Sequence, residues 1–177
     1  MRRRQPSLPN LWLISDARND AGLAAALRRL PRGSGFIFRH YHLDPAARRL
    51  RFTALAWIAR TRGHVVVLAG PARQARQWGA DGSYGAPLGR AAGPELRLAT
   101  AHSLREIGRA SRADAILLSP VFPTRSHPGA RPLGPLRFRL LAARARVPVV
   151  ALGGMDRRRA RRLGYGPWAA IDGLAMG

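Results

Sequence analysis

Short apolar segments alternate with longer amphipathic segments along the chain. The β-branched run Val65-Val66-Val67 is typical of a buried parallel strand. The longer segments carry apolar residues at helical spacing, as Leu50, Leu55 and Ile58 do. This alternation predicts a parallel sheet covered by helices. Strands are expected at 11–15, 35–41, 64–68, 81–85, 96–100, 115–121, 147–152 and 170–175, and helices at 21–30, 46–60, 72–78, 104–111, 133–146 and 157–163.

Eight expected strands indicate an α/β fold, specifically a (β/α)8 TIM barrel rather than an open sheet. The barrel would form a single domain over residues 1–177, with a basic N-terminal extension at 1–10. Because such barrels typically take about 250 residues, this one must be shortened. The fourth and eighth helices are expected to be reduced or missing, since the segment 87–95 is rich in Gly and Pro and little chain follows the eighth strand. A homodimer could cover the flank that these losses leave bare.

The amino-acid composition gives the chain a strong positive charge, which bears on its possible partners. The chain has 31 basic residues, all of them Arg, against 9 acids, which gives a net charge of +22. Such an excess favours phosphorylated small molecules or nucleic acid as partners. A GC-rich genome would also enrich Arg, but it explains the scarcity of acids less well. The absence of Cys excludes disulfides, zinc-thiolate sites and a thiol nucleophile. With no segment of about 18 apolar residues, no membrane association is expected, and a cytoplasmic location is favoured.

Three polar or glycine-containing clusters follow late strands, and the carboxyl ends of strands carry the active site in such barrels. Residues 119–127 combine hydroxyls, Arg and His, which together can wrap a phosphate. Gly153 and Gly154 leave a strand and precede a helix, a position that exposes backbone N–H groups to an anion. Residues 172–177 lie at the expected eighth strand. Each cluster alone is typical of an ordinary turn, but their joint order indicates a phosphate site.

These clusters resemble the thiamine-phosphate synthase family, most densely over residues 99–177. The resemblance rests on Pro-Val-Phe-Pro-Thr at 120–124, Gly-Gly at 153–154, Asp-Gly at 172–173, Ala-Thr-Ala-His-Ser at 99–103 and Gly-Ala-Asp-Gly at 79–82. The resemblance implies transfer of a hydroxymethylpyrimidine from its diphosphate to a thiazole phosphate, with release of pyrophosphate, in thiamine biosynthesis. It further implies that Arg39, Thr124, Arg125, Ser126 and His127 bind pyrophosphate, that Thr100 and His102 face the pyrimidine, and that Gly153, Gly154, Ala175 and Gly177 bind the thiazole phosphate.

The chain departs from the family pattern where a metal would bind. The resemblance implies Mg2+ as a cofactor, held by Asn-Asp after the third strand and by an acid after the fourth. Here the third strand ends in Leu68-Ala69-Gly70, and residues 84–88 contain no acid. No metal ligand can therefore be assigned, and Arg could screen the pyrophosphate instead. The related thiazole tautomerase is ranked lower, because Pro120 occupies the place of its acid-base His.

Other residues permit less specific interpretations. His40 and His42 would share a strand face, where solvated or capping roles are favoured over a metal pair. The Arg groups at 2–4, 48–51 and 157–162 could contact a phosphate backbone, although a solvated cationic face is more common. Two alternatives to the transferase stay open: a non-catalytic or repurposed relative that binds a phosphorylated ligand, and an Arg-rich nucleic-acid-binding protein, with any binding expected to be nonspecific.

Overall fold

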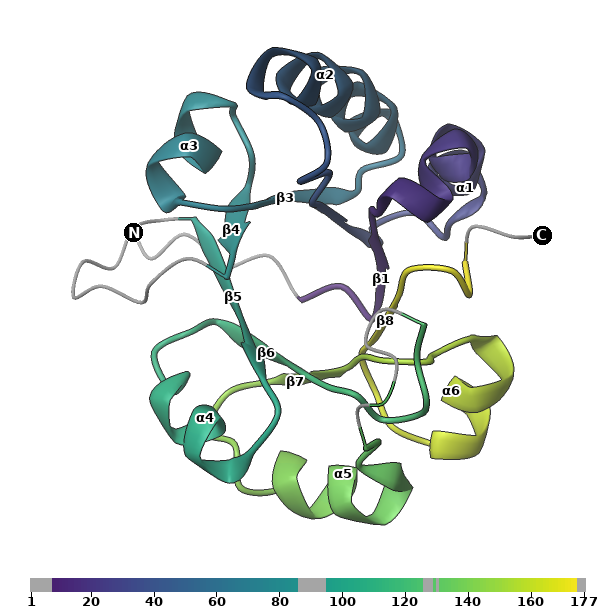
Figure 1. Cartoon of the computed structure of the whole chain (residues 1–177), viewed down its shortest axis with the longest axis vertical. Helices are drawn as coiled ribbons and strands as arrows, with labels where there is room; N and C mark the ends of the chain where they lie inside the picture. The colour runs from purple at the N-terminus through teal and green to yellow at the C-terminus, as the bar shows by residue number, and fades with distance from the viewer. Residues whose placement is uncertain (1–7, 86–94, 126–128, 130, 175–177) are drawn as a thin grey trace.

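Eight parallel strands close into a barrel in the computed structural model, which describes residues 8–85, 95–125, 129 and 131–174. Neighbours in the sequence are neighbours in the sheet, and β1 pairs with β8 to close the ring. Figure 1 shows the strands at the centre with the helices outside them. The strands are β1 (Leu11–Ile14), β2 (Gly35–Phe38), β3 (Val65–Ala69), β4 (Gly82–Tyr84), β5 (Leu96–Ala101), β6 (Ala115–Leu118), β7 (Val149–Ala151) and β8 (Trp168–Ala170).

Six α-helices and one 3-10 helix surround the strands in the described part of the chain, which confirms a shortened (β/α)8 barrel. They are η1 (Ala17–Gly22), α1 (Leu23–Arg29), α2 (Pro45–Thr61), α3 (Ala72–Gln77), α4 (Leu104–Arg109), α5 (Gly134–Ala142) and α6 (Arg157–Leu163). A cavity of about 520 Å³ lies between α1 and α6, where an eighth helix would pack. The segment of the reduced fourth helix lies largely outside the described residues. No helix of the described residues is long and apolar enough to cross a membrane.

Local sequence sets the helix boundaries. Asp44 caps α2, since its carboxylate accepts hydrogen bonds from the N–H groups of Ala46 and Ala47 at 2.9 and 3.0 Å. Asp156 caps α6 in the same way through the Arg159 N–H, at 2.8 Å. At the other end of α6, Gly164 adopts the left-handed conformation that terminates helices. These caps hold the loops at the carboxyl ends of β2 and β7 in place.

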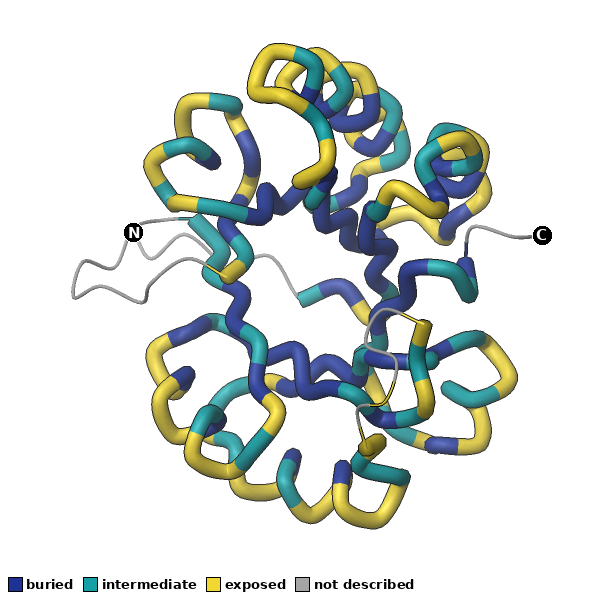
Figure 2. The backbone as a smooth tube through the Cα atoms, viewed as in Figure 1, coloured by how far each residue is buried: buried dark blue, intermediate teal, exposed yellow. Residues whose placement is uncertain are grey.

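The core has two layers, and both bury the strands (Figure 2). One cluster fills the barrel interior and includes Trp12, Ile37, Val67 and Leu117. Gly35 allows the Trp12 ring to fit there, because a Cβ at position 35 would overlap the indole. A second cluster lies between strands and helices and contains the Phe side chains of β2 and α2. The large exposed apolar side chains Leu50, Trp57, Leu136 and Leu140 lie on the outer faces of α2 and α5, and the homodimer stays a prediction.

Several boundaries differ from those expected: β6 ends at Leu118 rather than 121, β7 begins at Val149 rather than 147, and α5 ends at Ala142 rather than 146. For β2 and β8 the structure shows the cause. β2 ends at Phe38 rather than continuing to 41, because His40 adopts φ of +42° and turns the chain. His40 and His42 therefore do not alternate on a strand. The last strand is β8 at Trp168–Ala170 rather than 170–175, since it begins directly after Pro167 and the Trp168 N–H donates to the Asn10 carbonyl at 3.0 Å. Residues 8–10 of the expected N-terminal extension thus already contact the barrel, while 1–7 lie outside the described residues.

Candidate active site

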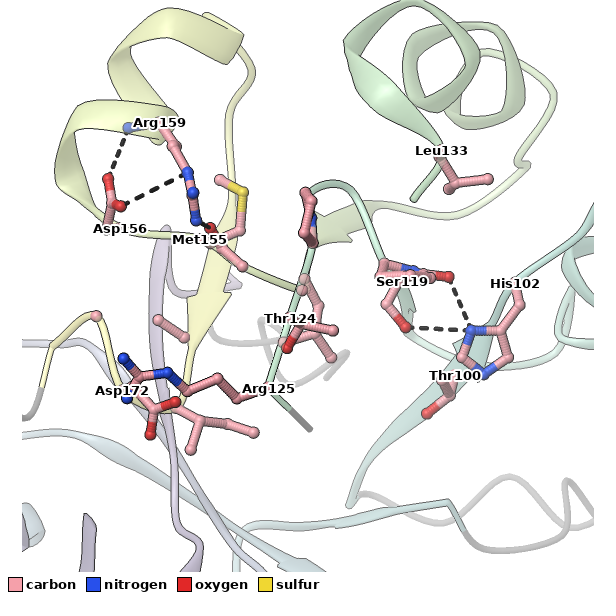
Figure 3. Close-up of a pocket in the computed structure, with 18 of the residues that line it drawn as sticks. Thr100, His102, Ser119, Thr124, Arg125, Leu133, Met155, Asp156, Arg159 and Asp172 are labelled. Carbon is pink, nitrogen blue, oxygen red and sulfur yellow. Dashed lines mark hydrogen bonds and ion pairs between the residues drawn. The ribbon is translucent and has the colours of Figure 1, made fainter. Parts of the chain in front are cut away.

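The largest described cavity opens at the carboxyl ends of the strands and measures about 1210 Å³. Side chains that follow β2, β4, β5, β6, β7 and β8 line it. In the view of Figure 3, Thr100, His102 and Ser119 lie on one side of the cavity and Asp156 and Arg159 on the other. The barrel topology therefore brings residues that are far apart in the sequence to a single space.

Arg39 enters the cavity from the end of β2. Its N–H donates to Ser15 Oγ at 2.7 Å, and its carbonyl accepts from Arg48 Nε at 2.8 Å. Its guanidinium lies 3.9 Å from a carboxylate oxygen of Asp16 and 5.7 Å from the centre of the Tyr41 ring. Burial of Asp16 opposes its charge, but the hydrogen bonds and charges of Arg18 and Arg39 outweigh this and lower the pKa of the carboxyl. The structure thus fixes Arg39 both at its backbone and at its charged group.

The loop after β6 forms one wall. Thr124 and Arg125 line the cavity, whereas Ser126 and His127 lie outside the described residues. His102, which follows β5, also lines the cavity, and its Nδ1 lies 2.8 Å from the Ser119 carbonyl oxygen. That bond orients the imidazole ring against the start of the loop. Five residues expected near the pyrophosphate and pyrimidine therefore line one cavity: Arg39, Thr100, His102, Thr124 and Arg125.

The glycine pair after β7 lies against that loop and continues the same wall, because β7 is the neighbour of β6 in the barrel. Gly153 and Gly154 have φ values of +95° and +60°, which favour residues without a Cβ. A Cβ at Gly153 would lie 2.6 Å from the Pro120 Cα, and one at Gly154 would overlap the chain at 122–123. The pair therefore also serves to pack the β6 loop closely, as the hydrogen bond from the Phe122 N–H to the Gly153 carbonyl at 3.0 Å shows. Ala175 and Gly177, expected at the same phosphate, lie outside the described residues.

Several cavity residues were not expected from the sequence, and among them Arg159 and Tyr84 make hydrogen bonds at the cavity. Arg159 belonged to an arginine run that was interpreted as a solvated face, but its Nη1 donates to the Gly154 carbonyl at 2.6 Å and the side chain lines the cavity. Tyr84 ends β4, and its hydroxyl accepts a hydrogen bond from Thr100 Oγ1 at 2.7 Å. Burial raises the pKa of the Tyr84 hydroxyl. No signal in the sequence distinguishes Arg159 from the other arginines of its run, and none identifies Tyr84.

The cavity is electropositive. Five arginines line it, namely Arg39, Arg125, Arg131, Arg137 and Arg159, against two aspartates, Asp156 and Asp172. Asp156 lies 3.8 Å from Arg159, and Asp172 lies 3.4 Å from Arg18. Arginine stays protonated at any physiological pH and binds phosphate oxygens in a bidentate manner. The arrangement therefore suits one or more phosphate groups.

The profile of the thiamine monophosphate synthase family matches residues 11–176, nearly the whole chain. The chain belongs to this family. A segment of 58 residues is 43% identical to "Putative thiamine-phosphate synthase 2" of Aquifex aeolicus (strain VF5), and the match spans 32% of this chain and 31% of that protein, so about a third of the relative's length is covered. Membership confirms the resemblance drawn from the motifs at 120–124 and 153–154.

Solved structures support the same fold. Thiamine phosphate pyrophosphorylase from Pyrococcus furiosus superimposes with a TM-score of 0.78 at 22% identity, covering 98% of this chain and 93% of that one. The enzyme of the same name from Bacteroides thetaiotaomicron gives a TM-score of 0.61 at 14% identity, covering 92% and 82%. Citrate synthase SbnG gives 0.63 at 9% identity, covering 93% and 86%. Because a citrate synthase scores as high as the second relative, these structural similarities establish the fold and not the reaction.

The Mg2+ that the resemblance implies does not fit the acids of this chain. All nine acids lie in the described residues, and each caps a helix, accepts a backbone N–H or pairs with a basic side chain. No group of three or more His, Asp or Glu suited to a metal occurs among the described residues. Mg2+ is usually held by one or two carboxylates together with substrate phosphates, and the two aspartates that line the cavity already pair with arginines, Asp156 with Arg159 and Asp172 with Arg18. The chemistry of the cavity is accordingly derived from its own side chains.

Proposed function

We propose that this barrel is a transferase that joins a hydroxymethylpyrimidine diphosphate to a thiazole phosphate and releases pyrophosphate. The observation that carries the proposal is the convergence of Arg39, Thr124 and Arg125 with Gly153 and Gly154 on a single cavity. Its volume of about 1210 Å³ exceeds the roughly 300–1,000 Å³ of pockets for one drug-sized ligand. The space therefore suits two small substrates side by side.

The proposed reaction breaks one bond and forms another. The C–O bond between the pyrimidine methylene and the diphosphate breaks, and pyrophosphate leaves with the electron pair. The thiazole nitrogen then attacks the resulting cation and forms the new C–N bond. Because no proton has to move, the main requirement is to stabilise the negative charge that develops on the leaving group. Guanidinium groups in a partly enclosed site supply that stabilisation.

The residues divide between the two substrates in this proposal. Arg39, Thr124 and Arg125, with Ser126 and His127, hold the pyrophosphate. Thr100 and His102 face the pyrimidine. The backbone at Gly153 and Gly154, with Ala175 and Gly177, holds the thiazole phosphate. Arg159 joins this second group, because it donates to the Gly154 carbonyl and lines the cavity beside it.

A phosphate-binding relative without turnover is the second candidate. The engagement of all nine acids favours it, since no carboxylate is left to hold a metal on the leaving group. In this candidate the five cavity arginines bind a phosphorylated ligand, and no bond is broken. The two candidates share one binding site and differ only in catalysis.

Calorimetry and a turnover assay separate the two. Pyrophosphate, thiazole phosphate and thiamine phosphate would be titrated with Mg2+ and with a chelator, and thiamine phosphate formation would be followed with both substrates present. Turnover that Arg39→Met abolishes and Arg49→Met leaves unchanged supports the transferase, because Arg49 is exposed on α2 away from the cavity. Binding without turnover supports the second candidate. If none of the three ligands binds, both candidates are wrong.

A further inference from the structure

His40 adopts a backbone conformation that is unusual for a residue with a Cβ, although its side chain does not line the cavity. It is the non-glycine residue of the described chain with positive φ, at +42°, and it is 1% exposed. This region is unfavourable for residues with a Cβ and is occupied where the surrounding structure imposes it. His40 directly follows Arg39, the cavity residue at the end of β2. The strained position thus lies next to the proposed pyrophosphate ligand.

A chain of hydrogen bonds leads from a surface acid through His40 to the backbone of Arg39. His40 Nε2 lies 2.7 Å from Asp20 Oδ1, and Nδ1 lies 2.7 Å from Ser15 Oγ. Ser15 Oγ also accepts the Arg39 N–H at 2.7 Å. A hydroxyl has one proton to give, so Ser15 donates it to Nδ1 while accepting from Arg39. His40 then carries its own proton on Nε2 and donates it to the Asp20 carboxylate.

The neutral imidazole agrees with its surroundings. The ring stacks on Phe38 at 4.7 Å, and burial lowers the pKa of His40 despite the raising effect of Asp20. The charged and titratable groups that face it are Asp20 from η1, Arg51 from α2 and His42 from its own loop. Arg51 Nε in turn donates to Asp20 Oδ1 at 2.8 Å, which keeps that carboxylate ionised. Every polar atom of the imidazole therefore has a partner in one tautomer.

The order Ser15, His40 and Asp20 resembles a hydrolytic triad, but its geometry excludes that role. Ser15 is fully buried, and its Oγ is engaged by the Arg39 N–H. Ser15 is also not among the residues that line the described cavity. A nucleophile must reach its substrate. The hydrogen bonds instead lead to the main chain of Arg39.

We propose that His40 is a positioning residue, which through Ser15 fixes Arg39 for binding the phosphate groups of the substrate. The inference rests on the proposed function for the identity of the ligand. β2 ends at Phe38, so side chains replace sheet hydrogen bonds at Arg39: Ser15 holds its N–H and the buried Arg48 holds its carbonyl. With its backbone fixed, the Arg39 guanidinium loses less freedom on binding, and the ligand binds more tightly.

The test uses His40→Asn, with Thr53→Asn as the control, because Thr53 is an exposed, uncharged residue of α2 outside the cavity. Asn tolerates positive φ but is too short to reach both Ser15 and Asp20. We expect His40→Asn to weaken pyrophosphate binding by about tenfold in calorimetry, while Thr53→Asn leaves it unchanged. Adding His40→Asn to Arg39→Met should weaken binding no further, because both changes act on the same group. Additive losses in the double variant would overturn the inference.

A second measurement requires no ligand. Hydrogen exchange of the Arg39 amide should accelerate in His40→Asn and in Ser15→Ala, which breaks the same chain of bonds without changing residue 40. Unchanged protection of that amide in both variants overturns the inference whatever the protein binds. If the unmodified protein binds no pyrophosphate but Arg39 protection is lost as expected, the proposed function fails while the His40 connection to Arg39 stands. The two failures are thus distinguishable.

Discussion

Arg158 and Arg159 are neighbours on α6 with different surroundings. Arg159 lines the cavity and donates to the Gly154 carbonyl at 2.6 Å, whereas Arg158 is exposed and lines the smaller cavity between α1 and α6 instead. Replacing either with Met removes one positive charge and leaves a side chain of helical propensity similar to Arg. The pair therefore separates a specific phosphate contact from the general effect of net charge.

The size of the effect follows from the contact. A hydrogen bond to a charged group contributes about 1.5–3 kcal/mol, which corresponds to a loss of about 10- to 150-fold in affinity. The Arg159 side chain is 44% exposed, so solvent and salt screen it and the lower end applies. We expect Arg159→Met to weaken binding of inorganic phosphate and thiazole phosphate about tenfold, and Arg158→Met about twofold or less.

Isothermal titration of both variants at low and at high salt is the assay. The Asp156–Arg159 ion pair is largely exposed and contributes about 1 kcal/mol or less to stability. Both variants should consequently unfold within a few degrees of the unmodified protein, which thermal denaturation checks. Equal losses of affinity in the two variants would show that net charge alone attracts the ligand, and the assignment of Arg159 to the site would be wrong.

Three further predictions concern the barrel and its glycines. Gly35→Ala should lower the free energy of unfolding by about 1–3 kcal/mol in urea titrations, because its Cβ overlaps the Trp12 ring. Gly108→Ala lies in open space on α4 and should raise the free energy of unfolding by about 0.5–1 kcal/mol. A loss of stability in both variants would contradict this. Gly154→Ala should weaken phosphate binding in calorimetry, since its Cβ would displace the β6 loop. Unaltered affinity would contradict the assignment of the glycine pair to the phosphate site. Burial lowers the pKa of His40 and of His64, so the unfolded chain takes up protons before the folded one as the pH falls. The free energy of unfolding should therefore decrease below about pH 6.5. An equal free energy of unfolding in urea at acid and at neutral pH would refute this.

Hydrophobic periodicity predicted the barrel because each strand buries both faces. The run at 65–67 and the aliphatic residues at 115–118 lie in strands as expected, because the barrel interior covers one apolar face of each strand and the helix layer covers the other. Boundaries were predicted less well where a single side chain decides them. His40 ends β2 through contacts with Ser15 and Asp20, which lie 25 and 20 residues away in sequence. Local pattern contains no information on such contacts.

The cavity residues likewise include some that the sequence predicted and others that only the structure places. Arg39, Thr124 and the glycine pair stand at the ends of strands, so a motif and a strand order were enough to place them in one cavity. Arg159 lies within a helix that is basic on every side, and only the three-dimensional position of the Gly154 carbonyl distinguishes it from Arg158. In a chain with this many arginines, composition does not distinguish an arginine that lines the cavity from one that is only exposed.

The positions of the nine acids show where the net charge of +22 is left unbalanced. These acids are used to cap helices such as α2 and α6, to hold backbone N–H groups such as that of Val66, or to pair with arginines such as Arg39. At the cavity, five arginines face two aspartates. A polyphosphate needs positive charge around it, whether from metal ions or from guanidinium groups. We propose that the five cavity arginines supply that charge here.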